Sequence, residues 1–161
     1  MRLTVEPHGF DGALADLRAM RERGEDVRPA LREAADDFRV VMGQQFTSSG
    51  GLTGGWVGLS PGYQARKQRD RPGRRTGVYT GVMQRSLTTR GAGSTQRVTK
   101  SRLVVGASAT ARGRARHVHL FDKGRGNQPA RPVVPPARVF EQRWSPIFER
   151  HLASDGYDGV V

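Results

Sequence analysis

The stretch RPALREAADDFRVVMGQQ, residues Arg28 to Gln45, decides the fold. Its apolar residues recur every three or four positions, which is the spacing of one helix face. They are Leu31, Ala34, Ala35, Phe38, Val41, Met42 and, just beyond the stretch, Phe46. Pro29 fits the first turn of a helix, where its missing N–H is tolerated. The sequence therefore predicts a long amphipathic helix of about 27 Å, at 1.5 Å per residue.

Four shorter helices are predicted around it from apolar spacing and from capping residues. They span Asp11–Arg23, Gln64–Arg69 (opened by Ser60-Pro61), Val78–Leu87 (capped by Thr80) and Arg138–Leu152. Pro146 lies inside the last of these, and proline removes a backbone donor there, so we expect a kink or a second helix start. Thr47–Gly58 is rich in glycine and serine and predicts a loop, which a buried Trp56 would anchor.

Strand-forming residues lie between the last two predicted helices. Their β-branched and apolar content predicts strands at Ser86–Arg90, Thr95–Lys100 and Arg102–Ala107, with a turn at Lys100-Ser101. The four prolines of Pro129–Pro136 exclude a helix there. Helices come first, strands next and a helix last. This order predicts an α+β fold in which a small antiparallel β-sheet packs against the long amphipathic helix, with long loops and a C-terminal helix.

The length and composition set the class of protein. At 161 residues we expect a single domain over residues 1–161, with a flexible tail at 154–161. The chain has no cysteine, which excludes disulfides, thiolate catalysis and cysteine-based zinc sites. No apolar run reaches the 18 residues of a membrane span, and Met1–Phe10 lacks the pattern of a signal peptide. We therefore expect a soluble protein made in the cytoplasm, with no membrane partner.

The positive charge is concentrated in the middle of the chain. Residues 1–45 carry 7 basic and 9 acidic side chains, residues 46–139 carry 18 and 2, and residues 140–161 carry 2 and 4. The densest part is a predicted basic loop at residues 66–75, with Arg66, Lys67, Arg69, Arg71, Arg74 and Arg75. Such a block is either a solvated, self-repelling loop or a contact for a polyanion.

No catalytic or metal chemistry is expected. His117-x-His119 with Asp122 resembles a metal site, but the spacing is common by chance and no second histidine-rich segment accompanies it. Asp70 and Asp122 are the only acidic residues in 46–139, which argues against a paired-carboxylate site. The serines lack a nucleophile elbow, and the glycine strings lack the spacing of a phosphate loop. The sequence predicts a protein that is not an enzyme and holds no cofactor.

Several separated motifs follow one another in a recognisable order. They are Trp56-x-x-Leu59-Ser60-Pro61, Thr80-Gly81-Val82-Met83-x-x-Ser86-Leu87, Val104-Val105-Gly106-Ala107, His119-x-x-Asp122-x-Gly124 and Pro129-Ala130-Arg131-Pro132. This order resembles the virion morphogenesis (tail completion) proteins of Mu-like phages and the related head–tail neck proteins of long-tailed phages. The resemblance covers Gln45 to Leu152. The chain departs from the pattern at Met83, at Arg116-His117 and at Val133-Val134, where the family has leucine, Tyr-Ala and an aromatic residue.

The resemblance implies a structural virion protein of the phage neck. It would be a tail-completion or tail-terminator subunit whose head-to-tail contacts close a hexameric ring, joining the tail tube to the head connector. The expected partners are its own copies, the tail tube protein and the head-completion or connector proteins. The basic loop would contact an acidic protein surface or the packaged DNA. We expect the protein in the virion neck, and in the host cytoplasm during assembly.

The candidate interaction residues are one aromatic residue and seven cations: Trp56, Arg66, Lys67, Arg69, Arg71, Arg74, Arg75 and Arg131. A second hypothesis needs no resemblance. Residues 46–139 have a net charge of +16, from 18 basic and 2 acidic side chains. A basic nucleic-acid-binding protein that uses this region for phosphate contacts is therefore the alternative.

Overall fold

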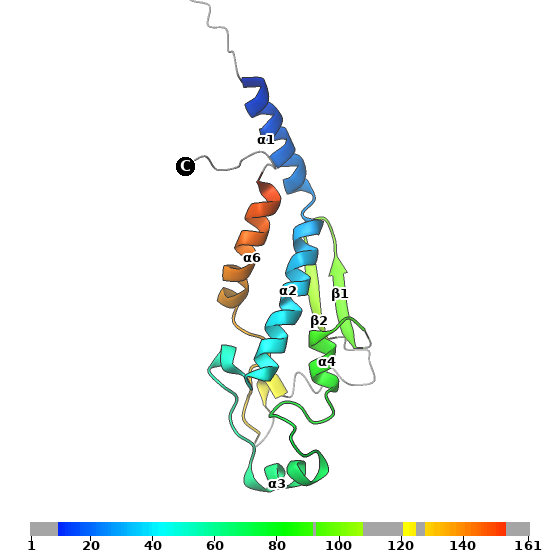
Figure 1. Ribbon diagram of the computed structural model, residues 1–161, viewed down its shortest axis with the longest axis vertical. Helices are drawn as coiled ribbons and strands as arrows, with labels where there is room; N and C mark the ends of the chain where they lie inside the picture. The colour runs from blue at the N-terminus through cyan, green and yellow to red at the C-terminus, as the bar shows by residue number, and fades with distance from the viewer. Residues whose placement is uncertain (1–9, 92, 108–120, 125–127, 154–161) are drawn as a thin grey trace, which may run out of the picture.

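The computed structural model describes residues 10–91, 93–107, 121–124 and 128–153. Its central element is helix α2 (Arg28–Thr47), against which the other elements of the body lie (Figure 1). All seven residues of the predicted apolar stripe on this helix are buried. Pro29 stands in the first turn, as expected. The long amphipathic helix is thus confirmed, and it extends two residues beyond the predicted end.

The body has a helix on one side of α2 and a hairpin on the other (Figure 1). Helix α6 (Ala137–Leu152) runs along the first side. On the second side lie α4 (Val82–Thr88) and the antiparallel strands β1 (Ser94–Val98) and β2 (Leu103–Ala107). Ser94 pairs with Ala107, and Val98 pairs with Leu103. The fold is therefore α+β, with a small antiparallel sheet beside a long helix.

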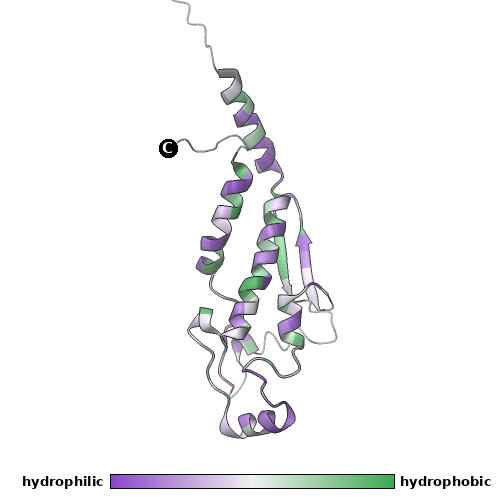
Figure 2. Ribbon diagram, viewed as in Figure 1, coloured by the Kyte–Doolittle hydropathy of each residue, from purple (hydrophilic) through white to green (hydrophobic). Residues whose placement is uncertain are grey.

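Aromatic packing and two ion pairs, Asp37–Arg143 and Glu33–Arg150, join α2 to α6. The ring of Phe38 stacks on Phe140 with centroids 5.7 Å apart, and Trp144 lies 5.1 Å from Phe140 on its own helix. The Asp37 carboxylate accepts hydrogen bonds from Arg143 Nε at 2.9 and 3.0 Å and from Trp144 Nε1 at 3.1 Å. These contacts, above all that of Arg143, hold the pKa of Asp37 below its ordinary value. Val105 and Ala107 of β2 pack against the same core, and Figure 2 shows apolar stretches on both α2 and β2.

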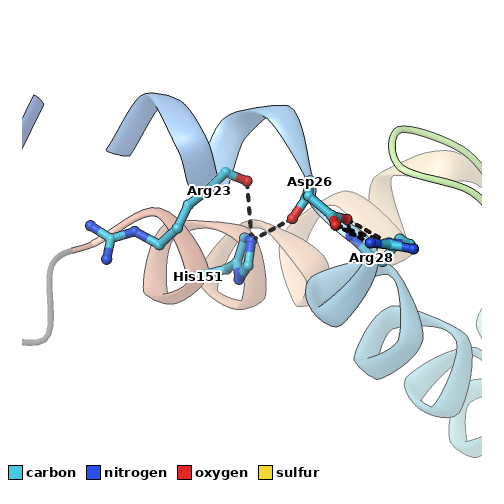
Figure 3. A network of polar contacts seen from close by, with 4 residues as sticks. All are labelled: Arg23, Asp26, Arg28 and His151. Carbon is cyan, nitrogen blue, oxygen red and sulfur yellow. Dashed lines mark hydrogen bonds and ion pairs between the residues drawn. The ribbon is translucent and has the colours of Figure 1, made fainter. Parts of the chain in front are cut away.

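Helix α1 (Phe10–Glu25) projects past the end of the body (Figure 1). Its existence was predicted, but its apolar residues Leu14, Leu17 and Met20 remain exposed. The junction with α2 is held by the last turn of α6 (Figure 3). There His151 Nε2 lies 3.3 Å from the Arg23 carbonyl and 3.2 Å from the Asp26 carbonyl, so that nitrogen is the donor.

Two predictions about the middle of the chain are wrong. The predicted strand at Ser86–Arg90 does not form, because Ser86 and Leu87 are the buried end of α4. Hydroxyl groups of Thr88 and Thr89 donate to carbonyls four residues earlier, a contact that a helix offers and a strand does not. The helix predicted at Val78–Leu87 begins later than expected, at Val82. The residue before it, Gly81, has a positive φ of 77°, which is not helical.

The other two helices differ from expectation in detail. Helix α3 (Pro61–Asp70) begins at the predicted proline, but the Ser60 side chain makes no capping hydrogen bond. Helix α6 contains Pro146 and continues through it to Leu152, with no second start. The loop predicted at Thr47–Gly58 contains one turn of 3-10 helix, η1 (Gly51–Thr53). As predicted, none of the residues described between Pro129 and Pro136 is helical.

Candidate functional site

Three of the sequence motifs meet around Trp56, in an arrangement that we call the Trp56–Arg131 lock. Trp56 is 8% exposed, and its Nε1 donates to the Pro132 carbonyl at 2.7 Å. Arg131, next to Pro132, is 6% exposed and donates in the opposite direction, to the segment that follows Trp56. Its Nε donates to the Val57 carbonyl at 2.7 Å and its Nη2 to the Gly58 carbonyl at 2.9 Å. Two segments more than 70 residues apart are thereby fastened side by side.

The segment Phe121–Gly124 completes the lock. The Phe121 ring lies edge-on to Trp56 with centroids 5.1 Å apart, and the Arg131 guanidinium lies 5.5 Å from its centroid. The Phe121 carbonyl accepts from the Arg131 amide at 2.9 Å. The Asp122 carboxylate accepts from the Val133 amide, also at 2.9 Å. The Asp122 side chain therefore holds the backbone at Val133 in place within the lock.

Gln45 is a member of the lock that the sequence analysis missed. It is fully buried at the end of α2. Its Nε2 donates to Thr53 Oγ1 at 2.9 Å and to the Pro132 carbonyl at 3.1 Å, and its Oε1 accepts from the Leu52 amide at 3.1 Å. A signal was present, because Gln45 lies four residues after Val41 on the buried helix face. A polar residue in that register predicts a buried hydrogen-bonded amide.

Two glycines lie close to the Trp56 ring, Gly50 at Cδ1 and Cγ of its five-membered part and Gly77 at Cζ3 of its six-membered part. Gly50 has φ +91° and Gly77 has φ +78°, a region that residues with a side chain adopt at a cost. A Cβ on Gly50 would stand 2.4 Å from the ring, and one on Gly77 would stand 2.5 Å from it. The tryptophan site is therefore closed by backbone at both the five-membered and the six-membered part of the ring. The prediction that Trp56 is buried is confirmed, and the ring packs within its own chain.

The segment 66–75 is not a free loop. Its first half belongs to α3, which ends at Asp70. Lys67 is 5% exposed, and its Nζ donates to the Arg75 carbonyl, while Arg75 Nη1 donates to the Thr47 carbonyl. Burial lowers the pKa of Lys67. These contacts fasten the segment to the end of α2, which corrects the expectation of a self-repelling loop over residues 66–75.

The remaining cations of this segment face solvent. The side chains of Arg66 and Arg69 are largely exposed and lie 3.9 and 3.2 Å from the Asp70 carboxylate. The hydrogen bonds from Arg69 and then from the Tyr79 hydroxyl hold the pKa of Asp70 below its ordinary value. Figure 2 shows α3 as largely hydrophilic, and Figure 1 places it at the end of the molecule opposite α1. The exposed part of the predicted interaction set thus forms one basic end.

A cleft of about 750 Å³, here called the basic cleft, opens beside α3. One wall is α3 itself, another is the segment 77–83, and the third is the lock. Its main side chains are Tyr63, Arg66, Lys67, Tyr79, Phe121 and Arg131. Among the residues that the structure describes, three cations line the cleft and no carboxylate does.

The structure thus divides the eight candidate interaction residues. Trp56, Lys67 and Arg131 are buried and engaged within the chain, whereas Arg66, Arg69, Arg71, Arg74 and Arg75 are exposed. Trp56 and Arg131 lie together in the lock, and Arg131 shares the basic cleft with Arg66 and Lys67. None of the three aromatic residues that line this cleft, Tyr63, Tyr79 and Phe121, was among the predicted interaction residues.

Other predicted sites receive no support from the described residues. His117, His119 and the tail at 154–161 lie outside them. Within the described ranges, no group of three or more His, Asp or Glu side chains could hold a metal ion. No helix in the same ranges is long and apolar enough to cross a bilayer. In comparisons with known proteins, no family model, no curated protein and no solved structure matches this chain.

Proposed function

We propose that this protein is a structural subunit of the neck of a long-tailed phage. It would act as a tail-completion or tail-terminator protein, and a ring of six copies would join the tail tube to the head connector. The observation that carries the proposal is the ordered set of motifs from Trp56 to Pro132, three of which meet in the Trp56–Arg131 lock. Motifs that build one buried scaffold are typical of a shared fold, and they need no catalytic role.

The shape of the subunit agrees with such a role. The molecule is elongated, with a projecting helix α1 at one end and the basic helix α3 at the other (Figure 1). The α1 end exposes Leu14, Leu17 and Met20, and the α3 end exposes arginines. Two unlike ends suit head-to-tail contacts, which close into a ring when the rotation between subunits allows it.

The experiment is a nonsense mutation of this gene in the phage that carries it, with the virions examined by electron microscopy. Without the protein we expect filled heads and separate tails, and with an epitope-tagged copy we expect six tags around the neck. A plasmid that supplies the protein is the control and should restore joined particles. Normal virions from the mutant phage, or a tagged protein that is absent from virions, would contradict the proposal.

The net charge favours one second candidate, a protein that binds nucleic acid. Residues 46–139 carry 18 basic and 2 acidic side chains. Such a protein would lose affinity for duplex DNA by about 10³-fold or more between 50 and 200 mM salt, because phosphate contacts release counterions. A neck subunit should bind duplex DNA weakly at both salt concentrations. Filter binding of a labelled 30-base-pair duplex at the two salt concentrations separates the two functions.

A further inference from the structure

Two buried cations line the basic cleft without a carboxylate beside them. Lys67 is 5% exposed and Arg131 is 6% exposed. Among the described residues, no acidic oxygen forms an ion pair with either of them. Their contacts are to backbone carbonyls: Lys67 to that of Arg75, and Arg131 to those of Val57, Gly58 and Pro129. Buried charges in proteins are ordinarily paired, and the described part of the chain supplies no counter-charge to Lys67 or Arg131.

The two carboxylates described beside the cleft are engaged with other groups. Asp70 contacts Arg66, Arg69 and the Tyr79 hydroxyl, and Asp122 accepts from the Val133 amide and lies 3.5 Å from Lys123. The segments 108–120 and 125–127, which flank Phe121–Gly124 in the sequence, contain no acidic residue. A second groove, between α2 and β1, gives a contrast. Its arginines Arg39 and Arg90 both contact the Asp36 carboxylate. The missing counter-charge is therefore a property of the basic cleft and not of every arginine-lined groove in this molecule.

We propose that the basic cleft receives an acidic peptide segment of an adjoining protein, in which a carboxylate stands next to an aromatic or aliphatic side chain. The carboxylate would meet Lys67 and Arg131 at the floor of the cleft, with Arg66 at its rim. The apolar side chain would lie against Phe121. This proposal rests on the proposed function, in which the adjoining protein is another component of the neck.

The floor has the hydrogen-bond donors that a carboxylate requires. The Lys67 ammonium has three donors, and the Arg75 carbonyl takes one of them. The Arg131 guanidinium has five N–H groups, of which three are engaged with carbonyls. Guanidinium and ammonium groups with free donors favour a carboxylate, because charge-assisted hydrogen bonds are about twice as strong as neutral ones.

A nucleic acid fits the same cleft less well. Single strands bind by stacking bases on free aromatic faces beside basic groups. Here the Arg66 guanidinium already lies 5.7 Å from the Tyr63 ring, and Arg71 lies 6.0 Å from that of Tyr79. The two tyrosine rings lie beside each other at 6.5 Å. A duplex would need exposed cations, whereas Lys67 and Arg131 are buried.

The experiment measures fluorescence anisotropy of a fluorescein-labelled octapeptide, Gly-Asp-Phe-Asp-Gly-Asp-Phe-Asp, with the full-length protein. Two comparisons isolate the charge: the same peptide with Asn in place of Asp, and the variant Lys67→Gln. The matched control is Lys100→Gln, which removes the same charge from an exposed turn between β1 and β2. We expect Lys67→Gln and the Asn peptide each to weaken binding about tenfold or more, and Lys100→Gln to change it less than twofold.

Several results would overturn the inference. They are equal binding of the Asp and Asn peptides, an equal loss in Lys67→Gln and Lys100→Gln, and a 20-nucleotide oligo-dT that binds more tightly and depends on Lys67. Circular dichroism checks the fold of each variant. If Lys67→Gln does not fold, Arg66→Gln on the exposed rim takes its place with the same expected direction. If the protein binds the peptide but is absent from virions, the neck function is wrong and the cleft proposal stands. If the protein is present in the virion neck but does not bind the peptide, the cleft proposal is wrong and the neck function stands.

Discussion

Gly77→Ala tests the Trp56–Arg131 lock, and Gly73→Ala is its matched control. Both glycines have positive φ, +78° and +71°, so alanine at either position strains the backbone similarly. A Cβ on Gly73 meets nothing within 4 Å, whereas a Cβ on Gly77 meets the Trp56 ring at 2.5 Å. The ring has little freedom to move, because Phe46 and Phe121 lie edge-on to it at 5.4 and 5.1 Å.

The two substitutions should therefore differ by the energy of the clash. The left-handed backbone costs roughly 1 to 2 kcal/mol for a residue with a Cβ, and this is the whole expected effect of Gly73→Ala. Overpacking in a filled site adds about 1 to 3 kcal/mol. We thus expect Gly77→Ala to lower the free energy of unfolding by about 2 to 5 kcal/mol, the sum of both contributions.

Urea unfolding followed by far-ultraviolet circular dichroism measures both variants. A double-mutant cycle with Trp56→Ala then isolates the clash, because removing the ring leaves only the backbone strain. Gly77→Ala should cost about 1 to 3 kcal/mol less in the Trp56→Ala background than in the natural chain. If Gly77→Ala is no worse than Gly73→Ala, or if its effect is the same with and without the ring, the closed tryptophan site is wrong.

Two further predictions concern the Asp37–Arg143 ion pair and the basic end. The Asp37 carboxyl has a pKa below its ordinary 3.8 in the folded protein, so its contribution to stability is full above that value and is lost as the pH falls below it. Asp37→Asn should lower the free energy of unfolding by about 1 to 2 kcal/mol at pH 7. In urea titrations at pH 3 the difference between the variant and the natural chain should be smaller, and a difference that is the same at both pH values would contradict this. Replacing Arg69, Arg71 and Arg74 together by serine should change the free energy of unfolding by less than about 0.5 kcal/mol, because all three side chains are exposed. The same variant should yield fewer particles in which head and tail are joined, and an unchanged phage yield would show that these charges are not needed for assembly.

Helices α1, α2 and α6 could be predicted from the sequence because one face of each carries apolar residues at helical spacing, whereas α3 was predicted from the Ser60-Pro61 pair. The stripe of α2 was predicted residue by residue, and Phe38, Met42 and Phe46 are buried as expected. The hairpin was also predictable, since the residues of β1 and β2 flank a short polar turn. The strand expected at Ser86–Arg90 failed because its residues suit either structure. Packing of Leu87 into the core decided for the helix.

The lock and the basic cleft were harder to predict because they depend on contacts between distant segments. Arg131 lies between prolines and looks like an exposed cation in the sequence, yet its donors meet carbonyls more than 70 residues away. Lys67 stands in a run of charged residues, and its burial follows from where α3 docks. Local patterns carry no information on such pairings. Two residues did indicate a buried site: Trp56, a large ring among glycines, and Gln45, a polar residue on the buried face of α2.

The lock also shapes the basic cleft, although Trp56 does not line it. The segment 77–83 begins at Gly77, which lies close to the six-membered part of the Trp56 ring, and the Phe121 ring packs on Trp56 with centroids 5.1 Å apart. A smaller ring would let both walls of the cleft shift, so Trp56→Phe should weaken binding of the acidic octapeptide as well as lower stability. Ile147→Ala, a buried change in α6 outside the lock and the cleft, should lower stability and leave binding of that peptide unchanged. If both variants bind the peptide like the natural chain, the cleft does not depend on the lock.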